Sequence, residues 1–429
     1  MRIWIGALAR KLRRSRQGSV AIQMGLVAAV LIGMAALAVD IGFAIYKHRQ
    51  MQSAADAAAF GAATALATGH PADFRTEAYA LAAAVGYVNG VDGVVITVNR
   101  PPVSPPASAA HAADPAAVQV IITQPQTLTL VGLFGSDLFT LGVSAVALQG
   151  SSCVLALSRS ANKAVSASGG AIVDLTKCGL AVYSTSDSSI DVSGGGTRIN
   201  AQTVSTAGDY RTSGGGSINP VQPPINTNAT NLPTDPYSGH TVPTPGTCLK
   251  TNYKLTGADS DTLIPGTYCG GISDKSSGEL TLMPGVYIIN GGDLTLGRGA
   301  TLNGKNGVSI VLTGATSKLV GTAQISGGST LNISAPTAGP MAGIALFQDP
   351  KASTGNDNKL LGGSTMTITG AAYFPNGAVN YTGGSGTVTT CMQLIALTIN
   401  FSGSSTLQLN CSGVPVLPIG SSSASQLVE

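Results

Sequence analysis

The stretch LIPGTYCGGISDKSSGELTLMPGVYIINGGDLTLGRGATLN, residues 263–303, repeats one pattern with small changes. Pro265-Gly266-Thr267-Tyr268 returns nineteen residues later as Pro284-Gly285-Val286-Tyr287. Short apolar runs separated by Gly-containing corners, with periods of about 20–40 residues, are typical of a solenoid. One coil cannot bury its apolar face alone and must stack on its neighbour. We therefore predict a mainly β protein whose distal region is a right-handed parallel β-helix.

The pattern extends in both directions, over residues 151–418. GGSTLNI at 327–333 returns as GGSTMTI at 362–368 and again as GSSTLQL at 403–409. Between 219 and 248 the pattern is lost and seven prolines punctuate the chain. Proline at this density argues against regular strands. We predict a Pro-rich excursion that interrupts the solenoid, with a plain linker between two β-domains as the alternative.

The cysteines give an independent indication of coil length. Consecutive cysteines are 25 residues apart (Cys153, Cys178), 21 apart (Cys248, Cys269) and 20 apart (Cys391, Cys411). Each separation is about one coil. Stacked strands lie about 4.8 Å apart, and the Cα atoms of a disulfide lie about 4.4–6.8 Å apart. Sequential pairing is thus geometrically possible, although other connectivities and free thiols remain open.

The N-terminus carries a membrane signal. Six basic residues and no acid occur in the first 16 positions, and residues 20–45 are almost uninterruptedly apolar. At about 1.5 Å per residue this run can cross a bilayer of about 30 Å. It lacks the short core and cleavage site of a removable secretory signal, so we expect it to be retained. The basic flank places the N-terminus in the cytoplasm and the bulk of the chain on the other side.

Composition agrees with export. Charged residues make up 10% of the chain, against about 25% in ordinary globular proteins. Outside the leader, 17 basic residues face 20 acidic ones. The positive formal charge therefore belongs to the leader, and we predict no nucleic-acid partner. All cysteines lie in the exported region, where disulfides persist.

We expect one long helix over residues 19–68, half in lipid and half outside. Gly25, Ala29 and Gly33 lie on one face of it, where small residues let a partner helix dock closely. Asp40 lies near the outer end of the membrane segment, either reaching water at the interface or forming a buried ion pair. Residues 69–150 follow, with a second amphipathic helix near 72–87 and three strand-like segments. We predict a small α+β domain there.

Three motifs in the N-terminal helix reveal a family. GSVA at 18–21, LAVDIG at 37–42 and QSAADAAA at 52–59 resemble the N-terminal segment of tight-adherence (Flp/Tad) pilus-assembly proteins of the TadG type. The leader also resembles a type IV prepilin signal, which is cut after a Gly and carries a Glu at the fifth position beyond. Gly18 and Ser19 fit such a cleavage site. The fifth residue is Gln23, which argues against pilin-style processing.

The distal region resembles the same family through the 263–303 stretch and through GIALFQD at 343–349. Some members instead carry a von Willebrand A domain with a DxSxS metal motif. The nearest candidate, Asp191-Val192-Ser193-Gly194-Gly195, lacks the second Ser, so we predict no metal site. One histidine, His240, and scattered acids form no catalytic motif. We predict neither enzymatic activity nor a cofactor.

The predicted organisation is a basic cytoplasmic leader (1–18), a transmembrane and stalk helix (19–68), a small α+β domain (69–150), a Gly-rich β-helix (151–418) with its excursion (about 219–248), and a flexible tail (419–429). The resemblance implies a structural component of pilus assembly in the bacterial inner membrane, exposing its β-helix to pilins, assembly proteins or envelope polysaccharide. The alternatives are a prepilin-like minor pilin or polysaccharide-binding adhesin, and a membrane-tethered β-helix enzyme that degrades polysaccharide.

Overall fold

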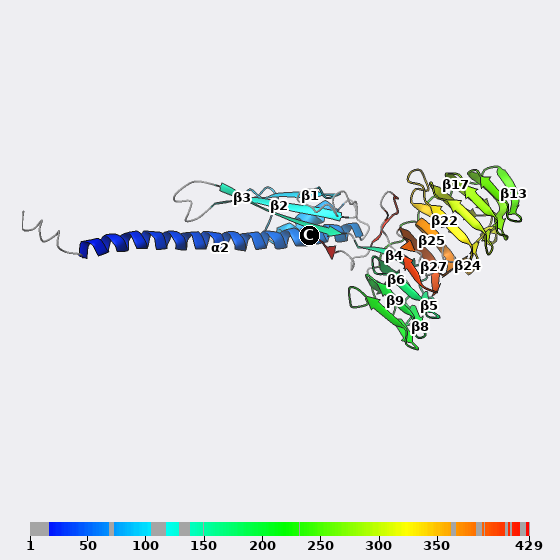
Figure 1. Ribbon diagram of the computed structural model, residues 1–429, viewed down its shortest axis with the longest axis horizontal. Coiled ribbons are helices and arrows are strands. Elements are labelled where there is room, and N and C mark those ends of the chain that lie inside the picture. The colour runs from blue at the N-terminus through cyan, green and yellow to red at the C-terminus, as the bar shows by residue number, and fades with distance from the viewer. Residues whose placement is uncertain are drawn as a thin grey trace, which may run out of the picture. The chain divides into compact units, whose positions relative to one another are not determined.

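The computed structural model describes residues 17–67, 73–103, 117–127, 138–148, 150–230, 232–361, 366–382, 388–389, 391–407, 411, 414–420 and 426–428. The chain divides into two compact units (Figure 1). The first unit consists of Met1–Ala62, Asp73–Leu148 and Leu427–Glu429, and the second of Ala63–Ala72 and Gln149–Gln426.

The first unit combines a long helix with an antiparallel sheet. Its elements are α2 (Gln17–Ala67), α3 (Phe74–Ala84), β1 (Val95–Asn99), β2 (Ala117–Thr127), β3 (Leu138–Leu148) and β30 (Gln426–Leu427). The strand order is β1-β2-β3-β30. The predicted long apolar helix and the second short helix are both confirmed. The described strands β1, β2 and β3 lie within the segment where three strands were predicted.

The second half of α2 packs closely in this unit because its buried side chains are small. Ala54, Ala55, Ala58 and Ala59, all within the QSAADAAA motif, are fully buried. Gln52 of the same motif donates to the Ser144 carbonyl oxygen on β3 at 3.0 Å. The motif is therefore a helix-packing motif, in which alanine lets the helix approach the sheet and glutamine ties it there.

The C-terminal segment differs from the predicted flexible tail. β29 (Ile419–Gly420) pairs antiparallel with the first strand of the solenoid. β30 joins the edge of β3, where the Val428 N–H donates to the Val146 carbonyl oxygen at 2.9 Å. Val428 also packs on the buried side chains of Ala117 and Val146. Residues 419–420 and 426–428 pair with neighbouring strands because they include apolar residues that can complete a sheet.

The second unit is a parallel β-solenoid of about ten coils, which confirms the predicted fold class. Residues 151–220, here the N-lobe, contain β4 (Ser151–Ala156), β5 (Val165–Ser168), β6 (Ile172–Leu175), β7 (Gly179–Val182), β8 (Ile190–Ser193), β9 (Arg198–Ala201), β10 (Val204–Thr206), β11 (Tyr210–Ser213) and β12 (Ser217–Pro220). Residues 248–407, here the C-lobe, contain the remaining coils.

The strands of the C-lobe are β13 (Cys248–Leu255), β14 (Ser260–Leu263), β15 (Gly266–Asp274), β16 (Glu279–Leu282), β17 (Gly285–Asn290), β18 (Leu294–Leu296), β19 (Thr301–Gly304), β20 (Val308–Thr313), β21 (Ala323–Ile325), β22 (Thr330–Ser334), β23 (Ile344–Gln348), β24 (Asn356–Leu360), β25 (Met366–Tyr381), β26 (Val388–Thr389), β27 (Met392–Ser402) and β28 (Ser405–Leu407). A short 3₁₀ helix, η2 (Ser317–Leu319), follows β20.

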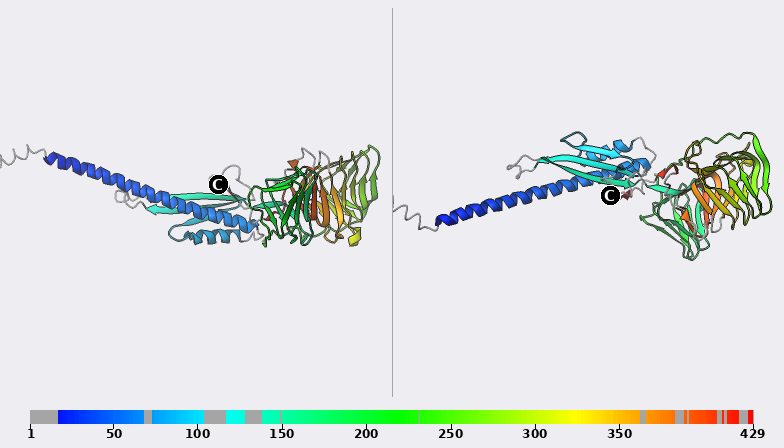
Figure 2. Two further views of the ribbon diagram at one scale, coloured as in Figure 1. Left: turned by 90° about the horizontal axis from the view of Figure 1, so that it is seen from below. Right: turned by 45° about the horizontal axis from the view of Figure 1, so that its top comes forward.

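The coils do not stack in sequence order. The N-lobe winds from β4 outward to β12, and the chain then restarts at β13, at the opposite end of the solenoid. The C-lobe winds back until its last coil stacks on the first coil of the N-lobe, through parallel pairing of β27 with β4 and β5 and of β28 with β6. In Figures 1 and 2, β27 at the red end of the colour scale therefore lies beside the teal strand β4.

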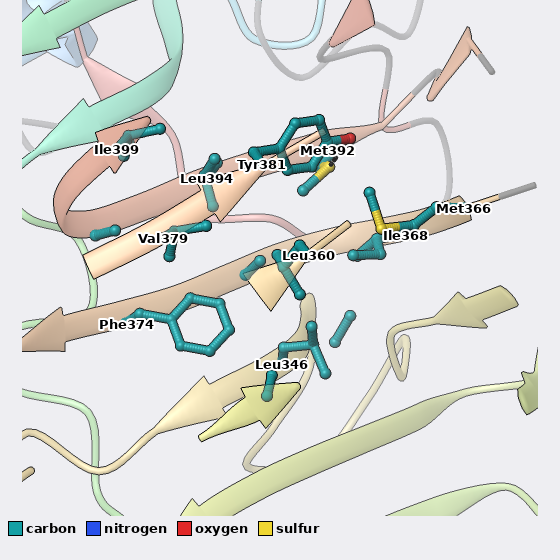
Figure 3. Packing of buried hydrophobic residues seen from close by; sticks show 14 of the residues in the cluster. Leu346, Leu360, Met366, Ile368, Phe374, Val379, Tyr381, Met392, Leu394 and Ile399 are labelled. Atoms are coloured by element: carbon teal, nitrogen blue, oxygen red, sulfur yellow. Dashed lines mark hydrogen bonds between the residues drawn. The ribbon is translucent and has the colours of Figure 1, made fainter. Parts of the chain in front are cut away.

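One apolar core runs through both lobes. Equivalent positions stack from coil to coil, as in the inner row Leu346, Ala372, Leu394, Val154 and Leu180, all at most 1% exposed. Figure 3 shows the C-lobe part of this packing next to the lobe junction. The row crosses the junction without interruption, so the lobes share a single core.

The described residues between 221 and 247, here called the strap, run along the outside of the solenoid. Strands β20, β23, β25, β27 and β4 stack on one side of the solenoid, and they carry a row of outward-facing apolar side chains. The row consists of Val311, Phe347, Tyr373, Ile395 and Leu155, each paired in register with the next. The strap buries this row by placing Tyr237 on it, in a second cluster separate from the inner core. The predicted Pro-rich excursion thus carries the chain from one end of the solenoid to the other.

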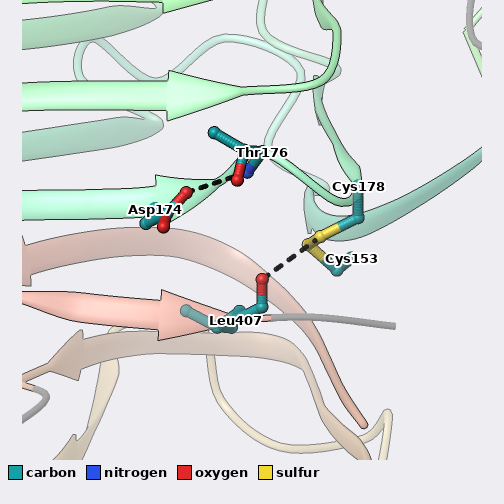
Figure 4. Close-up of a disulfide and its surroundings, with 5 residues drawn as sticks. All are labelled: Cys153, Asp174, Thr176, Cys178 and Leu407. Carbon is teal, nitrogen blue, oxygen red and sulfur yellow. Dashed lines mark hydrogen bonds between the residues drawn. A yellow bond between two sulfur atoms is a disulfide. The ribbon is translucent and has the colours of Figure 1, made fainter. Parts of the chain in front are cut away.

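Three disulfides join neighbouring segments, in the sequential pairs that the spacing allows. They link Cys153 to Cys178, Cys248 to Cys269 and Cys391 to Cys411, with Cα–Cα distances of 5.5, 5.6 and 4.6 Å. The first lies at the lobe junction, where the Cys178 Sγ atom is 3.5 Å from the Leu407 carbonyl oxygen (Figure 4). The first pair lies within the N-lobe, the second lies within the C-lobe, and the third joins the C-lobe to Cys411 just beyond it. None of the three joins the two lobes, which are held together by strand pairing, packing and the strap.

Removing the Cys248–Cys269 disulfide is expected to loosen the terminal coil of the C-lobe. A double Cys248→Ser, Cys269→Ser variant should lose about 3 kcal/mol of local stability, because the bond closes a loop of about 20 residues. Hydrogen exchange of residues 248–263 should accelerate about 100-fold, whereas exchange in β20 should stay unchanged. Unchanged exchange at 248–263 would show that packing alone holds this coil.

Candidate functional site

The first half of α2 presents apolar side chains outward. Ile22, Leu26, Val30, Leu31 and Ile32 are all more than half exposed. α2 is long and apolar enough to cross a membrane. At 51 residues it extends about 75 Å at 1.5 Å per residue. This helix is compatible with a single-pass membrane anchor.

The predicted docking residues lie on this exposed half. No atom lies within 4 Å of the position that a Cβ would take at Gly25 or Gly33, and Ala29 is exposed. Their face is therefore open to another helix. Asp40 differs from them, because it is only 3% exposed and is not without a partner.

The predicted processing residues lie at the start of the same helix. Gly18 and Ser19 fall in the first turn of α2, which begins at Gln17, and Gln23 lies exposed one turn later. A helical cleavage site would have to unwind before a peptidase could bind it. Processing at Gly18 stays a prediction.

The strap is held by a polar anchor that the sequence did not reveal. Tyr373 on β25 donates to Asp235 Oδ2 at 2.9 Å, and the Tyr237 N–H donates to Asp235 Oδ1 at 3.0 Å. Tyr183, after β7, donates to the Pro233 carbonyl oxygen. Burial raises the pKa of Asp235 and raises the pKa of Tyr183 to about 12. The anchor touches both lobes, so it holds them together.

Tyr237 is the centre of this anchor. It is 1% exposed, its ring centroid lies 5.5 Å from that of Tyr373, and its hydroxyl accepts the Leu417 N–H at 3.1 Å. A signal was present in the sequence, since an aspartate, a tyrosine and a histidine occur together within the Pro-rich segment. Nothing local showed that they would cover distant coils.

His240 on the strap makes the packing of the strap sensitive to acid. Its ring lies 5.5 Å from Phe347 and 6.3 Å from Tyr237. Burial lowers its pKa, and a hydrogen bond with the Pro340 backbone partly offsets this. The neutral form is therefore favoured in the folded state. The stability from His240 is fully present above its unfolded pKa, about 6.5, and is lost as pH falls through that value toward the lowered folded pKa.

The melting temperature of the full chain should thus decrease from pH 7 toward pH 5, and His240→Gln should flatten this decrease. Asp235 works in the opposite direction at lower pH, because its raised pKa gives stability that is present when it is protonated and lost as pH rises. Differential scanning fluorimetry of both proteins between pH 5 and 8 checks the slope. Parallel curves would exclude His240 as the titrating group.

Ladders of polar side chains lie on other outer faces of the solenoid. Asn400 donates to Asn380 Oδ1 at 3.1 Å and accepts from Ser166 Oγ at 3.0 Å across the lobe junction. Asn332 similarly donates to Asn303 Oδ1 at 3.1 Å. These ladders satisfy part of the hydrogen bonding of the amide and hydroxyl side chains in neighbouring coils. Among the described residues, no group of three or more His, Cys, Asp or Glu side chains is placed to hold a metal ion.

These features define a helix-bearing β-solenoid protein with a packed α+β unit. Residues 18–65 match the family model described as putative Flp pilus-assembly TadE/G-like, which confirms the resemblance carried by LAVDIG and QSAADAAA. The match covers α2 and none of the solenoid. No curated protein and no solved structure matches the chain. The Tad segment and the apolar helix together fit a pilus-assembly component.

Proposed function

We propose that the protein is a membrane-anchored structural component of tight-adherence pilus assembly, with its solenoid outside the cytoplasm. The observation that supports this proposal is that the two halves of the Tad segment, residues 18–65, differ in burial along α2. Most of the side chains described between residues 20 and 45 are apolar and exposed, whereas most of residues 51–62 are buried in a folded unit. A helix of this kind joins a bilayer to a globular body. Three disulfides in the solenoid support an oxidising compartment.

The open face at Gly25, Ala29 and Gly33 supports a docking role within the membrane. Small residues at this spacing let a second helix approach closely, so the proposed partner there is a membrane helix of the pilus machine. The solenoid then offers polar ladders and strand edges to pilins, assembly proteins or envelope polysaccharide.

Replacing residues 1–45 by a cleavable secretory signal should move the protein from the membrane to the soluble exported fraction and abolish pilus assembly. The physical reason is the loss of the apolar segment while the packed half of α2 is kept. Fractionation with carbonate extraction, together with counting of sheared pili, measures both effects. Normal pili assembled beside a stable, soluble variant would contradict the proposal.

A matched variant separates anchoring from docking. Gly25→Ile, Ala29→Ile, Gly33→Ile keeps the segment apolar but fills its open face. It should remain in the membrane, where carbonate does not extract it, and should lower pilus number by at least about tenfold. Wild-type pilus number in this variant would show that the face only contacts lipid.

A minor pilin is the second candidate, favoured by the packing of α2 beside a sheet in which β1, β2 and β3 are antiparallel. In that case the chain would be cut after Gly18 and carried in the fibre. Mass spectrometry of the N-terminal peptide decides between the two. An intact leader found only in membranes supports the anchored component, and a Ser19 terminus in sheared pili supports the pilin.

A further inference from the structure

The two ends of the solenoid differ in how their terminal strands are covered. At the N-lobe end the strap covers β10 of the last coil, whereas β11 pairs only with β8 and β12 only with β9. Asn226 of the strap forms a parallel bridge with Ser205, donates to the Val204 carbonyl oxygen at 2.9 Å, and accepts the Thr206 N–H at 2.9 Å. Ile225 beside it packs on the core. A strand-like segment of the strap thus caps β10.

The C-lobe end has no such cap among the described residues. β13 pairs only with β15, and β14 only with β16. The outer edges of both strands therefore present backbone N–H and C=O groups that no described strand pairs. Tyr253 and Leu255 of β13 are core residues left partly exposed at this end.

An apolar corner lies next to this edge. Leu249, Ile264 and Met283 are 47%, 53% and 48% exposed. Ile264 and Met283 follow Leu263 and Leu282, which pair in neighbouring coils. Leu249 lies over the adjoining Gly266, where a Cβ would be 2.5 Å from Leu249 Cδ1. Three exposed apolar side chains thus gather at one corner of the terminal coils.

We propose that the outer edge of β13 binds an extended segment of a partner protein, which adds to the solenoid as a further strand. The N-lobe end shows that a strand-like segment can close a coil of this solenoid. Strand addition satisfies the backbone groups of an edge and draws specificity from alternate side chains. Apolar residues of the segment would cover Tyr253 and Leu255.

The charged side chains on β13 favour a partner segment that carries an acidic residue. Lys250 is already paired with Asp261, with Nζ 3.1 Å from Oδ2, and Tyr253 donates to the same carboxylate at 2.6 Å. Lys254 is exposed and makes no ion pair within the described part of the chain. An acidic residue of the added segment would therefore face Lys254. A second copy fits poorly, because β13 carries two lysines and no acid, and edge lysines oppose self-pairing.

This inference deepens the proposed function by naming where the solenoid contacts a protein, and its biological role rests on that function. The test uses the full chain in detergent micelles and a fluorescein-labelled eight-residue peptide of alternating valine and glutamate. Two further peptides serve as controls, one with lysine in place of glutamate and one N-methylated at alternate residues. Anisotropy titrations compare wild type with Lys254→Glu and with Lys318→Glu, an exposed lysine on η2.

The glutamate peptide is expected to bind wild type and Lys318→Glu equally. Lys254→Glu should weaken it about tenfold and favour the lysine peptide instead. The N-methylated peptide should not bind, because it lacks N–H donors. Equal binding of the N-methylated peptide, an unchanged preference in Lys254→Glu, or no binding at about 1 mM would overturn the proposal. So would a dimer in sedimentation that Lys254→Glu dissociates. None of these results bears on membrane fractionation. A failure of strand addition can therefore be told apart from a failure of the proposed membrane anchor.

Discussion

Replacing Tyr237 by alanine is expected to lower the free energy of unfolding of the solenoid by about 3–5 kcal/mol, the usual cost of removing a buried aromatic side chain. Tyr237 is 1% exposed, and its ring packs against Tyr373 of the outward apolar row. Its loss would open a cavity under the strap and leave the Leu417 N–H without its acceptor. Hydrogen exchange should accelerate in β23 and β25, and proteases should cut within residues 221–247.

Two variants make this result specific to the strap. Tyr237→Phe keeps the ring and loses only the hydrogen bond, so it should cost about 1–3 kcal/mol. Tyr210→Ala removes a tyrosine that is 39% exposed on β11 and should change stability by less than about 0.5 kcal/mol. If Tyr237→Ala and Tyr210→Ala behave alike, the strap does not seal the solenoid.

Gly321→Ala is expected to cost about 3 kcal/mol or more, because overpacking against fixed atoms forces the backbone to move. An added Cβ would lie 1.8 Å from the Gly292 carbonyl oxygen and 3.0 Å from the Asp293 nitrogen. Neither atom belongs to a flexible side chain that could turn away. The Gly321 carbonyl oxygen also accepts from Gln348 Nε2 at 2.9 Å, so a shift would disturb the next coil as well.

Two other glycines separate crowding from backbone conformation. Gly239 has open space around its Cβ position and an ordinary φ, so Gly239→Ala should be nearly neutral. Gly291 also has open space but adopts φ +79°, so Gly291→Ala should cost about 1–2 kcal/mol. Urea unfolding of the full chain, together with hydrogen exchange of β17–β20, compares the stability losses of the three glycine variants. A loss for Gly321→Ala no larger than that for Gly291→Ala would exclude backbone crowding as the cause.

The split order of the coils affects how the protein forms. The edge of β4, β5 and β6 is completed by β27 and β28, which lie more than 200 residues later in the chain. Contacts of such long sequence separation form late. The first coil of the N-lobe is therefore covered only after nearly the whole solenoid has formed.

Local features of the sequence determined the building blocks. The 263–303 repeat predicts coils because apolar residues recur at one coil length, and cysteines at the same spacing can bridge neighbouring coils. The long apolar run and the alanine-rich motif predict α2, because hydropathy and helix propensity act within a few turns of the chain. The Pro-rich composition of 219–248 likewise predicts a departure from regular strands.

The tertiary structure alone decided which coil stacks on which, where the strap lies and what holds the C-terminal segment. Apolar residues at equivalent coil positions are interchangeable in sequence, so nothing local distinguishes β27 beside β4 from any other stacking. The pairing is selected by the shape of the whole core and by the path of the strap. The partners of Asp235 and Tyr237 are fixed in the same way, because Tyr183, Tyr373 and Leu417 reach them only after the coils have assembled.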